Sequence, residues 1–184
     1  HKWAVKKETK CLAEQICGWW KPLMATLWCS LPPIPSWALF YNQVKDRLSF
    51  PLMEVWRHSQ DVIHQFKQAS NAVLFAAGSC WEGVDFPGDM VSSLIIVRLP
   101  FPVPDPLSEA EREQYPTLQD YIRAVIIPDM QVKLRQGFGR AIRIETDTCV
   151  VSILDHRAAP GQRYHQAVLE TLPEPSTHQK KSKM

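Results

Sequence analysis

Apolar and polar positions follow two different patterns along residues 41–172, and each pattern predicts one kind of element. Continuous apolar runs predict strands buried on both faces, whereas a repeat of about 3.6 residues predicts helices with one apolar face. The predicted strands are residues 71–77, 92–99 and 148–154. The predicted helices are residues 59–69, 108–114, 118–125 and 128–143. Strands that alternate with helices predict an α/β fold with a mostly parallel sheet covered by helices.

The helix predicted over residues 59–69 shows the amphipathic pattern most clearly. Val62, Ile63 and Phe66 fall on one face, and Ser59 is a plausible N-cap. Before this helix, residues 42–48 are compatible with a helix or a turn. We therefore expect one folded domain over residues 41–172.

Residues 1–40 differ sharply in composition from the rest of the chain. They hold five of the seven tryptophans, three of the five cysteines and the cluster Pro32-Pro33-Ile34-Pro35. Their pattern allows a helix over residues 8–20 and a short strand over residues 37–40. Because the composition changes abruptly near Phe40, we interpret this segment as poorly ordered, or as the product of a shifted reading frame or a mis-called gene start. The tail over residues 173–184 is rich in Pro, Ser, Thr and Lys, which predicts disorder.

Composition and charge narrow the class of protein. The chain has 184 residues, 45% of them hydrophobic, so it is long enough to bury a core without disulfides or metals. The formal net charge is only +2, which excludes a polybasic nucleic-acid binder of the histone type. A local cationic groove stays possible, because affinity for nucleic acid depends on where the charges lie. No apolar run is long enough to span a membrane, and the start lacks a signal-peptide pattern.

The five cysteines show no pairing that would bind a metal. Their number is odd, their spacing is irregular, and no CxxC motif occurs. Neither a zinc site nor an iron–sulfur cluster is therefore predicted. We expect a reducing, cytosolic setting.

Glycine is scarce, but five of the seven glycines fall in two short windows. The first window, residues 78–88, directly follows a predicted buried strand. In an open α/β sheet, ligands bind beyond the carboxyl ends of the strands, and a glycine-bearing loop can present backbone N–H groups to an anion. Glu82 and Asp85 could hold a ribose hydroxyl or a neighbouring arginine there. The alternative is a plain turn in which both carboxylates cap backbone donors.

The second window lies within the helix predicted over residues 128–143. Gln136, Arg140 and Arg143 stand at positions i, i+4 and i+7 and share one face, which Lys133 extends. Such a stripe suits a polyphosphate, because arginine offers a planar fork of donors and keeps its charge. Two further glycines, Gly137 and Gly139, each cost about 1 kcal/mol inside a helix, which a purely structural helix has little reason to carry. The alternative is a solvated cationic face.

Four strings in this order resemble the C-terminal helicase region of DinG/XPD-type superfamily 2 helicases. They are Trp81-Glu-Gly-Val-Asp-Phe-Pro-Gly88, Leu99-Pro-Phe-Pro-Val-Pro104, Gln136-Gly-Phe-Gly-Arg-Ala-Ile-Arg143 and Leu154-Asp-His-Arg157. The resemblance implies a RecA-like three-layer domain, the second of two motor lobes, with ATP bound in the cleft between them. It also implies that translocation on single-stranded DNA and strand separation are the activities of the complete protein.

The resemblance assigns roles to the two windows. By position, Gln136, Arg140 and Arg143 match the family's last motif, whose arginines reach the γ-phosphate of ATP on the first lobe. Gly83 and Asp85 match the preceding motif, which couples the nucleotide to the DNA track, and Glu82 lies beside them. Leu99–Pro104 would be either a rigid extended connector or a ligand contact, and we favour the connector.

Other parts of the family's machinery have no counterpart in this sequence. It contains no G-x-x-x-x-G-K-[ST] phosphate loop and no DEAH-type metal-binding box. The resemblance places both in the first lobe, which would make most of the contacts with ATP and Mg²⁺. We therefore expect this chain alone to be inactive. A non-catalytic nucleic-acid-binding remnant and a DinG-like nuclease accessory domain remain alternatives.

Overall fold

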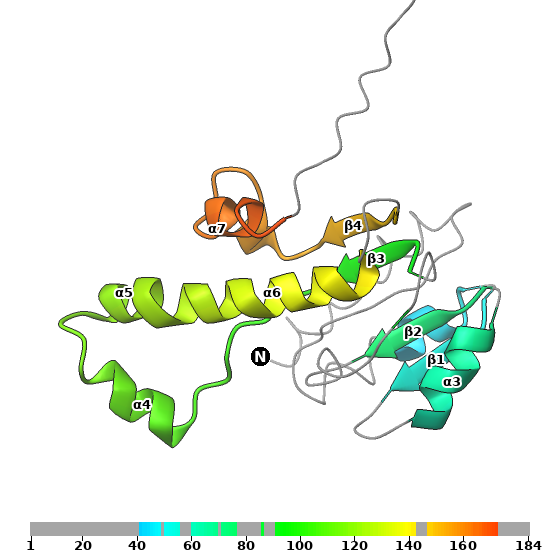
Figure 1. The fold of residues 1–184 in the computed structure, drawn as a ribbon, viewed down its shortest axis with the longest axis horizontal. Coiled ribbons are helices and arrows are strands. Elements are labelled where there is room, and N and C mark those ends of the chain that lie inside the picture. Colours follow the sequence, from blue (N-terminus) through cyan, green and yellow to red (C-terminus); the bar gives the residue numbers. More distant parts are fainter. Residues whose placement is uncertain are drawn as a thin grey trace, which may run out of the picture.

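The structure, a computed structural model, describes residues 41–48, 50–55, 60–69, 71–76, 86, 91–142 and 147–172. The predictions for residues 1–40, for Ser59 and for the tail over residues 173–184 lie outside these residues. Figure 1 shows the described helices and strands, coloured along the sequence from blue to red.

Four short parallel strands form the centre of the fold. β1 (Leu52–Val55) pairs with β2 (Val73–Ala76), and β3 (Ser93–Ile96) pairs with β4 (Val150–Ile153). Among the described residues these pairs form two separate ladders. The three predicted apolar runs each contain a strand, so the predicted parallel α/β architecture is confirmed. Strand β1 was not predicted, because its four residues include Glu54 and follow Pro51.

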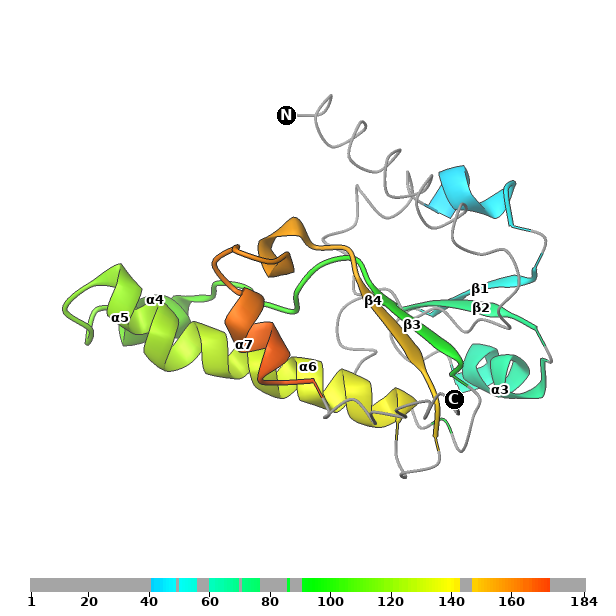
Figure 2. The same cartoon turned by 90° about the horizontal axis from the view of Figure 1, so that it is seen from above.

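Strands β2 and β3 are buried on both faces, as their continuous apolar runs predict, whereas β1 and β4 are mostly half-buried. Side chains alternate across a strand, so Leu74 and Leu94 lie on one face and Phe75 lies on the other. The first face belongs to a core shared with α3 (Gln60–Gln68) and α6 (Ile127–Ala141). On the second face, Tyr41 contacts Phe75 edge-on, with ring centroids 6.2 Å apart. Figure 2 accordingly shows α3 and α6 on one side of the strands and residues 41–45 on the other.

The prediction for α3 is confirmed and the prediction around Pro128 needs correction. In α3, Ile63 and Phe66 are buried, as the amphipathic pattern requires. The sequence predicted two helices separated near Pro128, but α5 (Leu118–Tyr121), a π-helical turn (η3, Ile122–Ile126) and α6 follow one another without a break. Proline lacks an N–H and clashes with the carbonyl four residues earlier. The helix accommodates it by widening, since the N–H of Ile127 bonds to the carbonyl of Ile122, five residues back.

Helix α4 (Pro106–Arg112) begins two residues before the predicted start, because its N-terminus carries strong local signals. Asp105 caps the helix by accepting from the Ser108 N–H, and the Ser108 side chain closes a capping box. Pro106 occupies the first turn, where its missing N–H costs nothing.

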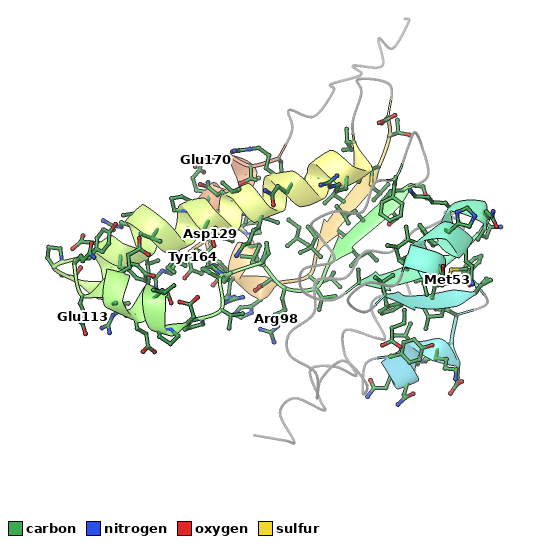
Figure 3. All side chains as sticks on the ribbon, turned by 60° about the horizontal axis from the view of Figure 1, so that its bottom comes forward. Met53, Arg98, Glu113, Asp129, Tyr164 and Glu170 are labelled. Atoms are coloured by element: carbon green, nitrogen blue, oxygen red, sulfur yellow. The ribbon has the colours of Figure 1, made fainter. Side chains whose placement is uncertain are left out.

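Residues 102–126, which include α4, α5 and η3, are here called the helical arm. The arm projects from the end of α6 that is distant from β1 and β2 (Figure 1). In Figure 3, Glu113 at the end of α4 and Met53 in β1 accordingly lie at opposite ends of the molecule. The arm thus extends beyond the layers that cover the strands.

After β4, a short 3-10 turn (η4, His156–Ala158) leads to α7 (His165–Leu169), and neither element was predicted. Gln131 of α6 donates to the carbonyl of Ala167 at 2.9 Å, which fixes α7 against α6. Among the helices of the described ranges, none has the length and apolar character needed to cross a membrane.

Candidate functional site

Helix α6 separates its apolar and polar residues as the sequence predicts. Leu134, Phe138 and Ala141 are buried in the core. Gln136 is exposed and Arg140 is half-buried, one helical turn apart on the opposite face. Neither side chain makes a hydrogen bond or ion pair with the described residues. The guanidinium and the amide are therefore available to a group from outside this part of the chain.

Lys133, which extends the stripe, has a partner. Its Nζ lies 3.0 Å from Asp129 Oδ2 one turn earlier in the same helix. This pairing offsets the lysine charge, so the unneutralised positive charge of the described stripe rests on Arg140.

The glycine at position 139 has no packing role that the structure reveals. A Cβ placed on Gly139 meets no atom within 4 Å, and the residue is exposed. Gly137, by contrast, is buried. Because nothing within this chain requires the missing side chain of Gly139, this position leaves the helix surface open beside Arg140.

The remaining predicted site residues belong to the two glycine windows. Gly83, Asp85, Glu82 and Arg143 lie outside the described residues. Within the first glycine window, the structure describes only Phe86. Its ring is buried against Phe66 of α3, with centroids 5.5 Å apart and nearly perpendicular. The window is thus anchored in the core at this point.

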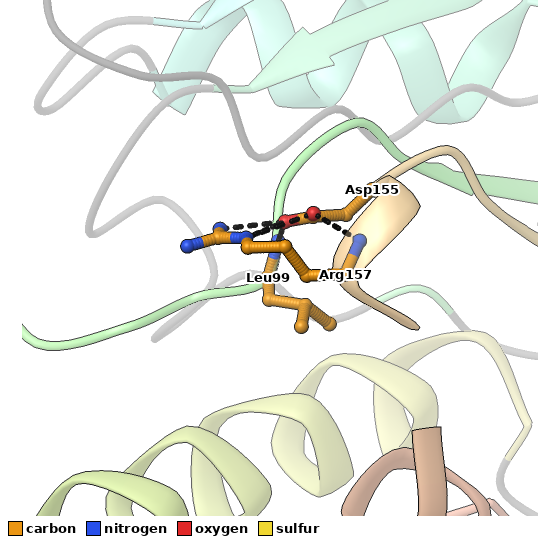
Figure 4. Close-up of polar contacts among 3 residues, drawn as sticks. All are labelled: Leu99, Asp155 and Arg157. Atoms are coloured by element: carbon orange, nitrogen blue, oxygen red, sulfur yellow. Dashed lines mark hydrogen bonds and ion pairs between the residues drawn. The ribbon is translucent and has the colours of Figure 1, made fainter. Parts of the chain in front are cut away.

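The strings Leu99–Pro104 and Leu154–Arg157, which are distant in sequence, meet through one buried carboxylate (Figure 4). Asp155 is 4% exposed and follows the carboxyl end of β4. Its Oδ2 accepts from the N–H of Leu99 at 2.9 Å and from Nη2 of Arg157 at 2.7 Å. Its Oδ1 accepts from the N–H and Nε of Arg157 at 3.1 and 2.9 Å. The carboxylate therefore joins the exits of β3 and β4.

The ionisation of this pair follows from its contacts. Burial alone would raise the pKa of Asp155, but the hydrogen bonds from Arg157 and Leu99, with the arginine charge, hold that pKa below its ordinary value. The hydrogen bond to Asp155 in turn raises the pKa of Arg157. Both groups are charged near neutral pH.

A row of side chains in contact with one another leads from this pair to the helical arm. The Arg157 guanidinium lies 4.8 Å from the ring centroid of Phe101, which lies 4.8 Å from that of Tyr164. Arg163 covers the Tyr164 ring and donates through Nη2 to Gln119 of α5 at 2.6 Å. The row fixes the Leu99–Pro104 segment, which supports its interpretation as a rigid connector.

Metal-binding and thiol chemistry find little support in the described ranges. There, no three His, Cys, Asp or Glu side chains come together as a metal site. Burial raises the pKa of the Cys149 thiol to about 11, which makes it a poor nucleophile. Cys80, in the first glycine window, lies outside the described residues.

The sequence matches a known protein-family model over most of its length. Residues 38–175 match the model described as the helicase C-terminal domain. The chain belongs to the helicase C-terminal domain family.

Individual relatives agree with the family. The helicase C-terminal domain described here is 39% identical over 139 residues to the ATP-dependent DNA helicase YoaA of Haemophilus influenzae, covering 74% of this chain and 21% of that protein. It is 41% identical over 135 residues to YoaA of Escherichia coli, again with 21% of that protein covered. The chain spans about a fifth of the length of these relatives.

Solved structures share the fold. The structure superposes on two XPD structures, named XPD_APO and XPD_Helicase, with a TM-score of 0.61 for each. The identity is 23%, and the match covers 83% of this chain and 32% or 28% of those chains. This likeness confirms the RecA-like α/β fold that the sequence predicts.

The sequence patterns missed the role of Asp155 and Arg157. The string that contains them was noticed only as part of the resemblance. A signal was nevertheless present, because an aspartate and an arginine two residues apart directly follow an apolar strand.

Proposed function

We propose that this chain is the second motor lobe of an ATP-dependent DNA helicase that acts in the cytoplasm. The observation that carries the proposal is the exposed face of α6, where the Arg140 guanidinium and the Gln136 amide face outward without a partner among the described residues. The membership of the helicase C-terminal domain family and the names of the relatives support it.

In this proposal, Arg140 and Arg143 act on ATP that is bound mainly by a first lobe with a phosphate loop. An arginine that reaches the transferred phosphoryl group stabilises the negative charge that develops on it. Gln136, one turn before Arg140, orients a water molecule by hydrogen bonding. When bound, ATP supplies the phosphoanhydride that is hydrolysed, and Mg²⁺ held by the first lobe offsets the phosphate charge.

The described residues are compatible with a site in which the first lobe binds ATP and this chain supplies the arginine. Arg140 is half-buried and is not neutralised by a carboxylate of the described residues, so its charge can be directed at a phosphate. The open surface at Gly139 permits a close approach by another domain or by the nucleotide. The first glycine window, with Gly83, Asp85 and Glu82, would couple this site to the DNA track.

Single-stranded DNA is the proposed polymer substrate. Contacts to backbone phosphates would give binding without strong sequence preference. ATP hydrolysis would then drive movement of the two lobes along the strand.

The test replaces the matching 135-residue region of the Escherichia coli YoaA protein with the corresponding part of this chain. We expect the chimera to hydrolyse ATP in the presence of single-stranded DNA. Arg140→Ala should lower the DNA-stimulated rate by roughly a thousandfold, the scale of arginine fingers. Gln136→Ala should lower it less.

The matched control is Arg135→Ala, which removes an exposed arginine from another face of the same helix. Circular dichroism verifies that each variant folds. Equal hydrolysis by the Arg140→Ala and Arg135→Ala chimeras would place the ATP contact elsewhere.

A second candidate function follows from one relative. The 3'-5' exonuclease DinG of Bacillus subtilis is 38% identical over 110 residues, which covers 59% of this chain and 12% of that protein. The chain would then be an accessory domain of a nuclease. A folded chimera that binds single-stranded DNA but hydrolyses no ATP would favour this function, or that of a binding remnant, over the motor.

A further inference from the structure

The helical arm carries an apolar groove whose lining includes none of the residues assigned to the proposed ATP site. The groove has a volume of about 480 Å³ and lies between the proline segment 102–104, one side of α4, and the α5–η3 turn. Its apolar side chains are Val103, Leu118, Tyr121, Ile122 and Ile126, together with the flanking prolines.

Large aliphatic side chains are exposed to an unusual degree at this place. Val103 is 84% exposed and Leu118 is 51% exposed, and both line the groove. Leu107, in the first turn of α4, is 82% exposed. Hydrophobic side chains that gather around a groove in this way mark an interaction site more often than isolated ones do.

The surroundings of the groove are acidic, although the whole chain is slightly basic. Glu109 lies in the lining, and the arm also carries Asp105, Glu111, Glu113 and Asp120. Its basic residues are Arg112, which also lies in the lining, and Arg123. The five carboxylates and two arginines of the arm give a net charge of −3. This charge repels the DNA backbone and favours a basic partner.

The electrostatics of Tyr121 agree with this distribution. Burial, followed by the negative charges of Glu111 and Asp105, raises the pKa of the Tyr121 phenol. The carboxylates therefore act on the floor of the groove as well as on its edge.

The backbone around the groove favours a helix as the occupant. Three prolines at positions 102, 104 and 106 remove the N–H donors from one edge of this extended segment, and the Asp105 N–H on the other edge already donates to Ser108 Oγ, so little of the segment can pair with an added strand. The remaining walls are helical and offer apolar side chains. An amphipathic helix can fill such a groove with residues spaced at i, i+3 or i+4, and i+7.

The position of the arm favours a separate protein over the first motor lobe. Arg140 lies 22 residues after Leu118 along the continuous helical segment, which corresponds to roughly 33 Å. A first lobe that meets Arg140 would therefore have to extend along this whole segment to cover the groove.

We propose that the groove of the helical arm binds an amphipathic helix of a separate partner protein, with apolar anchors in the groove and Lys or Arg residues facing the acidic rim. The choice of a separate partner over the first lobe rests on the proposed motor function, which places that lobe at Arg140, whereas the groove and its charge do not.

The test is a selection of helical peptides from a display library on the immobilised 184-residue chain. We expect the enriched peptides to carry apolar residues at helical spacing, flanked by Lys or Arg. Their affinity, measured by fluorescence anisotropy, should fall at least about tenfold in the double variant Val103→Ser, Leu118→Ser. The double variant Glu109→Lys, Glu111→Lys should cause a similar loss and reduce the dependence on salt.

The matched control is the double variant Val132→Ser, Leu169→Ser. It removes two aliphatic side chains that are each 47% exposed and do not line the groove. This variant should bind the peptides as the wild type does, and circular dichroism verifies folding of all variants.

Five results would overturn the proposal. Enriched peptides with acidic flanks, or with binding unaffected by the groove variants, would show that the predicted chemistry is wrong. A Val103-dependent dimer in sedimentation would assign the groove to a second copy. Loss of oligothymidine binding in the groove variants would assign it to DNA. Peptides that bind the chain but not the YoaA chimera would show that the rest of the polypeptide covers the groove.

Discussion

The carboxylate of Asp155 accepts a hydrogen bond of 2.9 Å from the backbone N–H of Leu99, across 56 positions of the sequence. Because the two residues follow β4 and β3, the bond holds together the carboxyl-end exits of two paired strands. Arg157 completes the arrangement with a planar two-point contact to the same carboxylate. The proline segment thus leaves the sheet in one fixed direction and carries the arm with it.

Replacement of this carboxylate should destabilise the fold. Asp155→Asn keeps the size of the side chain but removes its charge, so the contacts from Arg157 and Leu99 lose most of their strength. We expect a loss of about 2 kcal/mol in the free energy of unfolding, the scale of a hydrogen bond to a charged group. Urea denaturation measures it. Asp46→Asn, at an exposed position, should change stability by less than about 0.5 kcal/mol.

The same pair predicts a pH dependence. The folded-state pKa of Asp155 is below its ordinary value, so the unfolded chain binds the proton more readily. The stabilisation is therefore complete above the unfolded pKa of about 3.9 and is lost as the pH falls through the folded pKa. The difference in unfolding free energy between wild type and Asp155→Asn should stay at roughly 2 kcal/mol from pH 5 to 7 and should shrink below about pH 4. A difference that grows towards low pH would contradict the assignment.

The thiol of Cys149 should react slowly with alkylating reagents. With a pKa of about 11, only about one thiol in a thousand is ionised at pH 8, against about a quarter for an ordinary cysteine. We expect modification by iodoacetamide on the order of a hundredfold slower than in urea, followed by peptide mass spectrometry. Equal rates in the folded and unfolded chain would show that the thiol is not held in an apolar site.

The sequence predicted three of the four strands, β2, β3 and β4, from their apolar runs. Both faces of β2 and β3 are buried, so burial leaves no alternation and the pattern is unambiguous. The prediction of helix boundaries was wrong at a proline, because a proline can either end a helix or lie within one. Pro128 usually ends a helix, but a π-helical turn before it lets α5, η3 and α6 continue.

The candidate site was predictable only in part. The helical spacing of Gln136 and Arg140 predicts a shared outward face, and the structure has them on it. Their role in ATP hydrolysis stays a prediction, as do the roles of Gly83, Asp85, Glu82 and Arg143. No single stretch of the sequence predicts the groove, because separate segments within residues 102–126 form it only when they pack together.

Two glycines in open space should respond in opposite ways to alanine. Gly139 lies within α6, so Gly139→Ala should stabilise the chain by about 1 kcal/mol, the helix-propensity difference. Gly161 has a φ of +78°, a left-handed conformation, so Gly161→Ala should destabilise it by about 1 kcal/mol although its added Cβ also meets no atom within 4 Å. Urea denaturation measures both values.

The activity of the Gly139→Ala variant then shows whether another lobe or a nucleotide approaches α6 at this glycine. If another lobe or a nucleotide approaches the helix beside Arg140, the added methyl group blocks it, and Gly139→Ala in the YoaA chimera should lower DNA-stimulated ATP hydrolysis at least about tenfold while raising stability. Gly161→Ala serves as the opposite control, with lower stability and unchanged hydrolysis at a temperature where it is folded. A Gly139→Ala chimera that is more stable and fully active would mean that nothing approaches the helix at this position, and the ATP contact of Arg140 would then need a different geometry.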